Sequence, residues 1–219
     1  MAEAMLFSQM RPPRGEEARF ERWYDIDHIA KRLVLEGFRG AFRYWQLPPE
    51  GSTHHHLAIY ELESLNAVAT PEYLRLKVDP GEETEYFLGH VSDFTRFTMT
   101  RITDQGEENA RGAFLSVVAF QVPGEDEEEF EDWYVDEHVP LLLQAGDWLR
   151  VHRYRVVDGV GGPWTHLALH ELATAEVMRS PERARARNGP KRDALAERPW
   201  FGQSGRWLYR RAAAHQAKG

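Results

Sequence analysis

A ten-residue pattern occurs twice in this chain, as FERWYDIDHI at 20–29 and as FEDWYVDEHV at 130–139. The copies are 110 residues apart, because 130 minus 20 is 110. The same offset relates three further pairs: RY at 43–44 and 153–154, HLAIYEL at 56–62 and HLALHEL at 166–172, and PE at 71–72 and 181–182. Near the end of each half the register slips, as YFLG and WFGQ indicate. Self-similarity over such a distance decides the architecture of a chain, and here it predicts a tandem duplication.

Both halves have the same order of expected elements. An apolar, β-rich run (AMLFSQM or AFLSVVAFQV) precedes a charged amphipathic helix at roughly 15–35 or 125–145. Two strands follow, with turns expected at PPEGS (48–52) and DGVGGP (158–163). A second helix is expected near Ser64 or Thr174, which are good N-cap residues. A last strand, DFTRFTMTRI or GRWLYRRAA, ends each half.

The order βαββαβ predicts the α+β class and a ferredoxin-like unit, an antiparallel sheet with both helices on one face. A single unit would leave the other sheet face uncovered, and apolar faces of that size favour pairing. We therefore expect two ferredoxin-like repeats, 1–102 and 112–219, with a linker at 103–111. They would form an intramolecular pseudo-dimeric α+β barrel. Because each repeat covers the other, the chain is expected to be a monomer or a weak homodimer.

The doubled pattern places a tyrosine and a histidine on the apolar face of the first helix of each repeat. Residues four apart share one face of a helix, so Tyr24 and His28 follow Phe20 inward, as Tyr134 and His138 follow Phe130. Buried hydroxyl and imidazole groups need hydrogen-bond partners. The stripe predicts either a pocket with catalytic residues or a satisfied polar network that duplication has copied.

An arginine lies on the next strand of each repeat, Arg43 and Arg153. Turned inward, it would need an anionic partner, such as a substrate carboxylate, a phenolate or a developing oxyanion. Alternatively, it is exposed at a strand edge or pairs with Asp27 or Glu137. We count Arg43 and Arg153 as candidate substrate-binding residues.

Four further aromatic residues complete the candidate substrate-binding set: Trp23, Trp133, His56 and His166. The two tryptophans are most simply packing anchors of helix against sheet. The run HHH at 54–56 resembles a metal cluster, but strand alternation separates its side chains and Trp164 replaces His54 in the second copy. We expect no metal site.

The composition narrows the classes of function. A net charge of −8 disfavours a nucleic-acid-binding surface, and the absence of cysteine excludes thiolate chemistry and disulfides. The start MAEAMLFSQM lacks the features of a signal peptide, and no apolar run has the roughly 20 residues that cross a bilayer. No phosphate-binding or dinucleotide motif is present. We expect a soluble, cytoplasmic protein without a cofactor, whose partner is a small hydrophobic molecule.

The motif W-Y-x-x-x-H-[IV]-[AP], followed by R-Y on the next strand, resembles the EthD-like branch of the dimeric α+β barrel superfamily. The second copy, WYVDEHVP, is closer to it, because the first has Ala30 where Pro140 stands. The resemblance covers both halves. It implies a pocket between sheet and helices, with His28 or His138 as acid or base. The superfamily includes cyclases, isomerases, decarboxylases and cofactor-independent monooxygenases.

The leading hypothesis is a cofactor-independent enzyme for an aromatic or polyketide-like compound, of the lyase, isomerase or cyclase type. Histidine would transfer the proton, since its ordinary pKa suits neutral pH. Tyr24 or Tyr134 would donate to a developing enolate or phenolate. The alternatives are a cofactor-independent monooxygenase and a non-catalytic binding or scaffold module. Which repeat holds the active pocket stays open.

Overall fold

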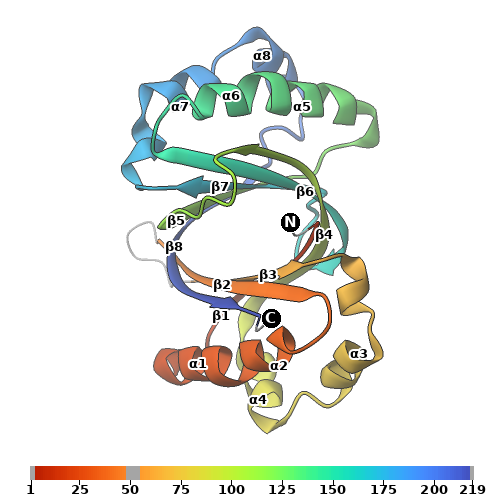
Figure 1. Ribbon diagram of the computed structural model, residues 1–219. Coiled ribbons are helices and arrows are strands. Elements are labelled where there is room, and N and C mark those ends of the chain that lie inside the picture. The colour runs from red at the N-terminus through yellow and green to blue at the C-terminus, as the bar shows by residue number, and fades with distance from the viewer. Residues whose placement is uncertain (1–2, 48–54, 218–219) are drawn as a thin grey trace. The chain divides into compact units, whose positions relative to one another are not determined.

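We describe the protein from a computed structural model, which covers residues 3–47 and 55–217. The turn expected at 48–52 and His54 lie outside these residues. Hydrogen bonding orders the strands β1-β3-β2-β8-β5-β7-β6-β4 in a closed barrel. The α+β class, the barrel and the βαββαβ order of both repeats are thereby confirmed (Figure 1).

The first repeat contains β1 (Ala4–Arg11), α1 (Glu17–Trp23), η1 (Tyr24–His28), α2 (Ile29–Leu33), β2 (Phe38–Gln46), β3 (His56–Leu62), η2 (Leu65–Val68), α3 (Pro71–Val78), α4 (Glu82–His90) and β4 (Ser92–Gly106). The second contains β5 (Phe114–Phe120), η3 (Gly124–Asp126), α5 (Glu127–Trp133), η4 (Tyr134–His138), α6 (Val139–Leu142), β6 (Trp148–Val160), β7 (His166–Leu172), η5 (Glu176–Arg179), α7 (Pro181–Ala186), α8 (Pro190–Ala196) and β8 (Gly205–Gln216). Here η1 and η4 are π-helical turns, and η2, η3 and η5 are 3₁₀ turns.

The chain forms two compact units, whose boundaries differ from those of the sequence repeats by short segments. Unit 1 comprises Met1–Thr100, Val157–Gly162 and Arg211–Gly219, and unit 2 comprises Arg101–Val156 and Pro163–Arg210. The expected linker at 103–111 begins inside a strand, because β4 continues to Gly106. The turn expected at 158–163 is likewise shorter, since β6 runs to Val160. Gly159 permits this: a Cβ there would lie 2.3 Å from the Arg96 carbonyl oxygen.

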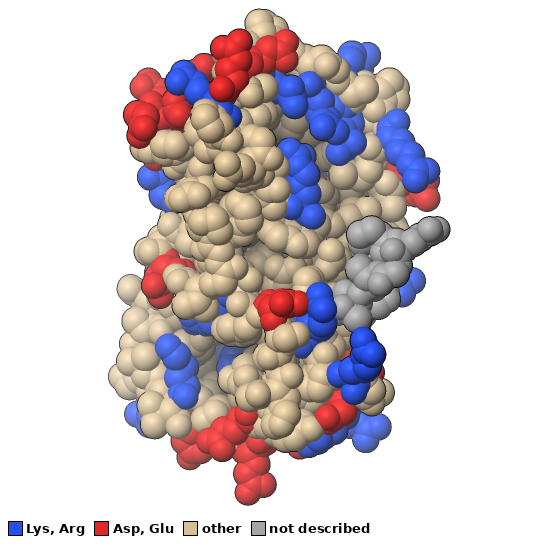
Figure 2. All heavy atoms as spheres, turned by 180° about the vertical axis from the view of Figure 1, so that it is seen from behind, with Lys and Arg blue, Asp and Glu red and all other residues tan. Residues whose placement is uncertain are grey.

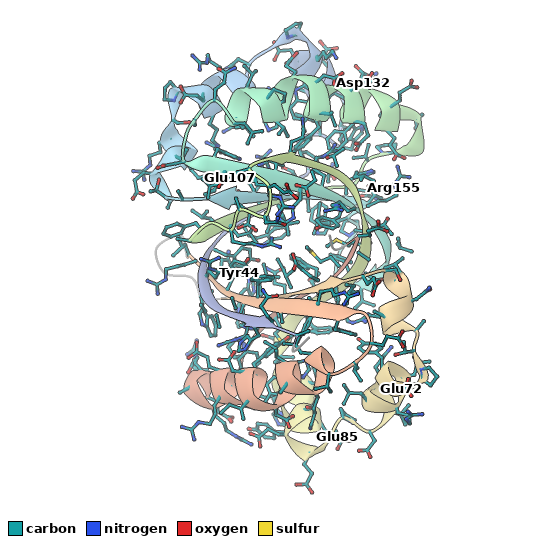
Figure 3. All side chains as sticks on the ribbon, in the orientation of Figure 1. Tyr44, Glu72, Glu85, Glu107, Asp132 and Arg155 are labelled. Atoms are coloured by element: carbon teal, nitrogen blue, oxygen red, sulfur yellow. The ribbon has the colours of Figure 1, made fainter. Side chains whose placement is uncertain are left out.

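Each unit has its own core between the sheet and the helices on one face (Figure 1). In unit 1, Phe20, Trp23 and Tyr24 pack with Phe38 and Phe87. In unit 2, Phe120, Phe130, Trp133, Trp148 and Phe201 form the corresponding cluster. Burial of such aromatic area holds helix to sheet. Two acidic residues of the same helices, Glu85 and Asp132, face outward (Figure 3).

The helix that carries the doubled pattern is not regular, in contrast to the expectation of one α-helical stripe. In both repeats it widens into a five-residue π-helical turn, Tyr24–His28 or Tyr134–His138. The wider turn brings residues five apart together. The ring centres of Trp23 and His28 are 4.6 Å apart, as are those of Trp133 and His138. Such turns within α-helices occur frequently at functional sites.

The second helical segment of each repeat begins later than expected. Ser64 caps only the 3₁₀ turn η2, and α3 begins with Thr70 accepting from the Tyr73 amide. Ser180 caps α7 in the same way. No helix among the described residues combines the length and apolar character needed to cross a membrane.

The backbone at Gly112, just before β5, lies very close to the backbone of Leu172 at the end of β7. A Cβ at this position would lie 2.1 Å from the Leu172 carbonyl oxygen and 2.4 Å from its amide nitrogen. Because backbone atoms cannot move aside, we expect Gly112→Ala to lower the free energy of unfolding by at least about 2 kcal/mol. Urea unfolding followed by circular dichroism measures this. Gly124→Ala is the matched control, since its Cβ meets nothing within 4 Å; equal midpoints for the two variants would contradict the prediction.

Candidate functional site

Unit 1 contains a cavity of about 260 Å³ beneath the first helix. Tyr24 and His28 line it, as the sequence predicts, together with Ser8, Arg32 and Tyr60. All five side chains are buried, with exposed fractions of 8% or less. The remaining lining residues are Leu6, Met10, Tyr73, Leu76, Lys77, Pro80, Thr84, Leu88, Phe94 and Arg96. The cavity therefore has a polar inner wall and an apolar surround.

Several polar atoms on this inner wall have no hydrogen-bond partner. They are the hydroxyl oxygens of Tyr24 and Tyr60 and the Nδ1 atom of His28. Tyr60 and Ser8 approach the Tyr24 hydroxyl closely enough to influence its pKa, but without normal hydrogen-bond geometry. Burial raises the pKa of both phenols, and it lowers the pKa of His28 well below the usual range, helped by the Arg32 charge. All three groups are neutral near pH 7.

Unit 2 contains a second cavity, of about 210 Å³, in the corresponding place. His138 lines it from η4, and Ser116 and His170 line it from the sheet. Arg183, Arg187 and Arg206 supply its charge. The other lining residues are Val118, Leu142, Trp148, Met178, Trp207 and Leu208. An aromatic and aliphatic wall with a few polar groups is typical of small-molecule sites.

The tautomer of His138 is set by one hydrogen bond. Its Nδ1 atom lies 2.7 Å from the carbonyl oxygen of Ala186, and a carbonyl only accepts. Nδ1 therefore carries the proton and Nε2 keeps its lone pair. Burial lowers the pKa of His138 to about 4, although the Ala186 contact acts in the opposite direction. A neutral imidazole whose Nε2 can accept a proton is the state that a general base requires.

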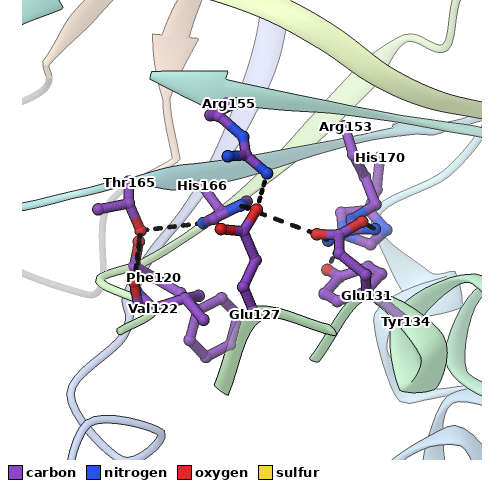
Figure 4. A network of polar contacts seen from close by, with 10 residues as sticks. All are labelled: Phe120, Val122, Glu127, Glu131, Tyr134, Arg153, Arg155, Thr165, His166 and His170. Atoms are coloured by element: carbon purple, nitrogen blue, oxygen red, sulfur yellow. Dashed lines mark hydrogen bonds and ion pairs between the residues drawn. The ribbon is translucent and has the colours of Figure 1, made fainter. Parts of the chain in front are cut away.

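His170 belongs to a short hydrogen-bonded chain. The Trp148 indole nitrogen, which only donates, lies 3.2 Å from its Nδ1 atom. Nε2 of neutral His170 therefore carries the proton and donates to the Tyr134 hydroxyl over 3.1 Å (Figure 4). Tyr134 does not line the cavity, unlike Tyr24 in unit 1. Burial raises the pKa of Tyr134 to about 12, so that it stays a neutral phenol that orients His170.

Both cavities are positively charged, although the whole chain has a net charge of −8. The described residues that line each cavity include three cationic side chains and no carboxylate. Two of the three lie at equivalent positions: Lys77 with Arg187, and Arg96 with Arg206. Arg96 is opposite Ser8 of β1, as Arg206 is opposite Val118 of β5, so the last strands keep the 110-residue offset. The register slip that YFLG and WFGQ indicate is therefore confined to the segments before β4 and β8.

The cationic groups of unit 2 lie near one another. Burial lowers the pKa of Arg183 and of Arg206, and the Arg187 charge lowers both further. Viewed from behind, basic side chains gather on the molecular face where α7 lies (Figure 2). Among the described residues, no carboxylate forms an ion pair with Arg183, Arg187 or Arg206. These charges are available to an anionic ligand.

Arg43 and Arg153, which the sequence suggested for anion binding, are instead paired within the protein. The Arg43 guanidinium binds the Asp25 carboxylate through two nitrogens, one of them at 2.6 Å. Arg153 binds Glu131, with its Nη1 atom 2.7 Å from a carboxylate oxygen (Figure 4). Neither arginine is among the described residues that line the unit 1 cavity or the unit 2 cavity. The salt-bridge alternative was therefore right in kind, but the expected partners Asp27 and Glu137 were wrong, because Asp25 and Glu131 point toward the strand.

The remaining candidates also lie outside the cavities. Trp23 donates to the Thr84 hydroxyl over 3.2 Å and stacks on Phe87, and Trp133 contacts Phe201. His56 packs edge-on against Phe20, and His166 lies 3.4 Å from a Glu127 oxygen (Figure 4). The structure thus places these four residues in the core and in the polar network around it. No group of three potential metal ligands occurs in residues 3–47 or 55–217.

Three pairs of equivalent lining residues were not among the candidates from the sequence. Tyr60 and His170 lie on β3 and β7, Arg96 and Arg206 lie on β4 and β8, and Lys77 and Arg187 lie on α3 and directly after α7. The sequence contained a feature that could have identified them: the two members of each pair are 110 residues apart, and both are polar. The difference between Tyr60 and His170 is visible in the sequence, but only the structure shows that both side chains face a cavity.

No protein-family model matches this sequence, and no curated protein matches it either. Among solved structures, an anthrone oxidase-like protein superposes with a TM-score of 0.73 at 9% identity, over 100% of this chain and 95% of its own. A protein from Fusobacterium nucleatum named "Putative monooxygenase" gives 0.62 at 9% identity, over 100% and 96%. A chlorite dismutase variant from Candidatus Nitrospira defluvii gives 0.57 at 11%, over 97% and 91%. These similarities confirm the dimeric α+β barrel fold, while the EthD-like assignment stays a prediction.

The Arg153 pair leads to a prediction about stability. Glu131→Gln would leave the buried guanidinium of Arg153 without a counter-charge, at a cost of about 3 kcal/mol of unfolding free energy. Asp132→Asn removes the neighbouring exposed carboxylate and should change stability by less than about 0.5 kcal/mol. Urea unfolding of both variants decides the matter. If Glu131→Gln were as stable as Asp132→Asn, Arg153 would not depend on its internal partner.

Proposed function

We propose that this protein is a cofactor-independent enzyme that removes a proton from an acidic carbon of a small aromatic compound, in the unit 2 cavity. The observation that carries the proposal is the fixed tautomer of His138, whose Nε2 lone pair is free at the wall of a cavity. His138 acts as the general base.

The cationic side chains supply the second requirement. When a proton leaves a carbon next to a carbonyl or phenol system, the electron pair moves onto oxygen and creates an oxyanion. Arg206, Arg183 and Arg187 have no internal carboxylate to neutralise them, so they can stabilise that oxyanion. Charged donors that are already in place cost little reorganisation at the moment of reaction. The aromatic lining, Trp148 and Trp207, fits a flat ring system.

The carbanion then has two possible fates. Protonation at another atom gives an isomerisation, a cyclisation with dehydration, or an elimination. Reaction with oxygen is a monooxygenase reaction, in which a methylene group and O₂ yield a carbonyl group and water. The structural similarity to proteins named for anthrone oxidation and monooxygenation favours the second fate. An anthrone has such a methylene group, and its deprotonated form is an aromatic oxyanion.

Deuterium exchange at the anthrone methylene, measured by NMR under argon in D₂O, tests proton removal apart from its later fate. We expect the wild-type protein to accelerate exchange and His138→Asn to reduce that acceleration by about 10²–10⁴-fold. The asparagine amide can still donate to Ala186, so the fold should tolerate it. His90→Asn, on the exposed side of α4, is the control. Undiminished exchange in His138→Asn would leave a non-catalytic binding module as the better account. Oxygen uptake in air then distinguishes the two fates.

The pH dependence of the same exchange gives an independent prediction. The base must be neutral to accept a proton, and the pKa of His138 is about 4. We therefore expect kcat/KM to stay constant as the pH falls from neutral to about 5, and to decline only near pH 4. If His138 had the ordinary histidine pKa of about 6.5, kcat/KM would already be halved at a pH of about 6.5. A midpoint near 6.5 that is absent from His138→Asn would contradict the buried, neutral state.

A further inference from the structure

The two cavities share their position in the fold but differ in their inner walls. Five equivalent pairs of lining residues, each 110 residues apart, differ in chemical character: Leu6 with Ser116, Ser8 with Val118, Arg32 with Leu142, Tyr60 with His170, and Tyr73 with Arg183. Unit 1 has Ser8 and Arg32 where unit 2 is apolar. Unit 2 instead has Ser116 in place of Leu6 and Arg183 in place of Tyr73, and Tyr60 and His170 are both polar.

The unit 1 wall carries polar groups for which the described residues supply no hydrogen-bond partner of normal geometry. The Tyr24 and Tyr60 hydroxyls and the His28 Nδ1 atom are buried without a partner. Leaving a buried polar group unpaired costs about 1–3 kcal/mol. Three such groups around one cavity are therefore explained by a ligand that supplies the missing partners.

The charge of the wall indicates the sign of that ligand. Arg32 is only 8% exposed, and its Nη1 atom donates to the His28 carbonyl oxygen at 2.8 Å. Among the described residues it forms no ion pair with a carboxylate. Lys77 and Arg96 add two further positive charges to the lining. A buried guanidinium without a counter-charge is costly unless an anion binds it.

His28 differs from His138 in the feature that makes His138 a base. No carbonyl accepts a hydrogen bond from its Nδ1 atom, so its tautomer is not fixed. The nearby Arg32 charge opposes any protonation of the ring. His28 is thus suited to donate a hydrogen bond to a ligand rather than to accept a proton from one.

We propose that the unit 1 cavity is a second ligand site, which binds an aromatic oxyanion, a carboxylate or a phenolate, without performing proton transfer on it. Tyr24, Tyr60 and Arg32 bind the charged oxygens, and the apolar surround, including Leu6 and Met10, holds the ring. The volume of about 260 Å³ lies just below the range typical of ligand pockets, so the ligand is a small aromatic compound. This site is independent of the role proposed for His138.

Fluorine NMR with 5-fluorosalicylate as the probe tests the proposal. We expect a bound signal that belongs to unit 1 and is weakened at least tenfold in Arg32→Leu and in Tyr60→His. Both substitutions install the residue that unit 2 has at the same place, so the fold should accept them. Tyr86→Phe is the control, because the Tyr86 hydroxyl binds Glu16 outside the cavity. 4-Fluorobenzyl alcohol, a neutral probe, should bind at least tenfold more weakly.

Arg206→Gln separates the two sites. Any signal from the unit 2 cavity should weaken in this variant, while the unit 1 signal persists. Near-UV circular dichroism confirms that each variant is folded. Equal affinity of wild type, Arg32→Leu and Tyr60→His for 5-fluorosalicylate would overturn the proposal, as would equal binding of the neutral probe. Neither outcome bears on deuterium exchange by His138, so the two proposals fail separately.

Discussion

The contact between a tryptophan and a histidine five residues later determines much of what this protein can do. It occurs in both repeats with ring centres 4.6 Å apart, and it requires the π-helical turn that carries the histidine. Removing an imidazole from water in this way disfavours its charged form. His28 and His138 are consequently neutral and face cavities. The buried aromatic cluster of each helix thus serves the fold and the chemical state of the histidine together.

Comparison of the two copies shows which properties of the site duplication preserved. Each cavity keeps three cationic side chains, although only two of them occupy equivalent positions. In unit 1 the third is Arg32 on α2, and the equivalent residue in unit 2 is Leu142. In unit 2 the third is Arg183 on α7, and the equivalent residue in unit 1 is Tyr73. The number of cationic lining residues is thus the same in both copies, although one of the three lies at a different position. The polar inner walls, in contrast, have diverged.

Much of the fold could be predicted from the sequence because duplication doubles every signal. The repeat fixed the element order, and the apolar stripe placed the tyrosine and histidine inward. The π-helical turn could not be predicted, since α-helical and π-helical spacing both keep Tyr24 and His28 close. Arg43 and Arg153 were misjudged for a physical reason: their partners, Asp25 and Glu131, stand at non-equivalent positions, so the repeat offers no common partner to find. The strand ends at Gly106 and Val160 depend on backbone approach at glycines, which periodicity does not reveal.

The proposed chemistry requires that His138 be a neutral imidazole protonated on Nδ1, with Nε2 open to the cavity. Nitrogen-15 chemical shifts of the histidine rings measure this directly at neutral pH, with His138 assigned by comparison with His138→Asn. We expect a protonated, pyrrole-like shift for Nδ1 and an unprotonated, pyridine-like shift for Nε2. Two protonated nitrogens at pH 7, or a proton on Nε2 alone, would contradict it.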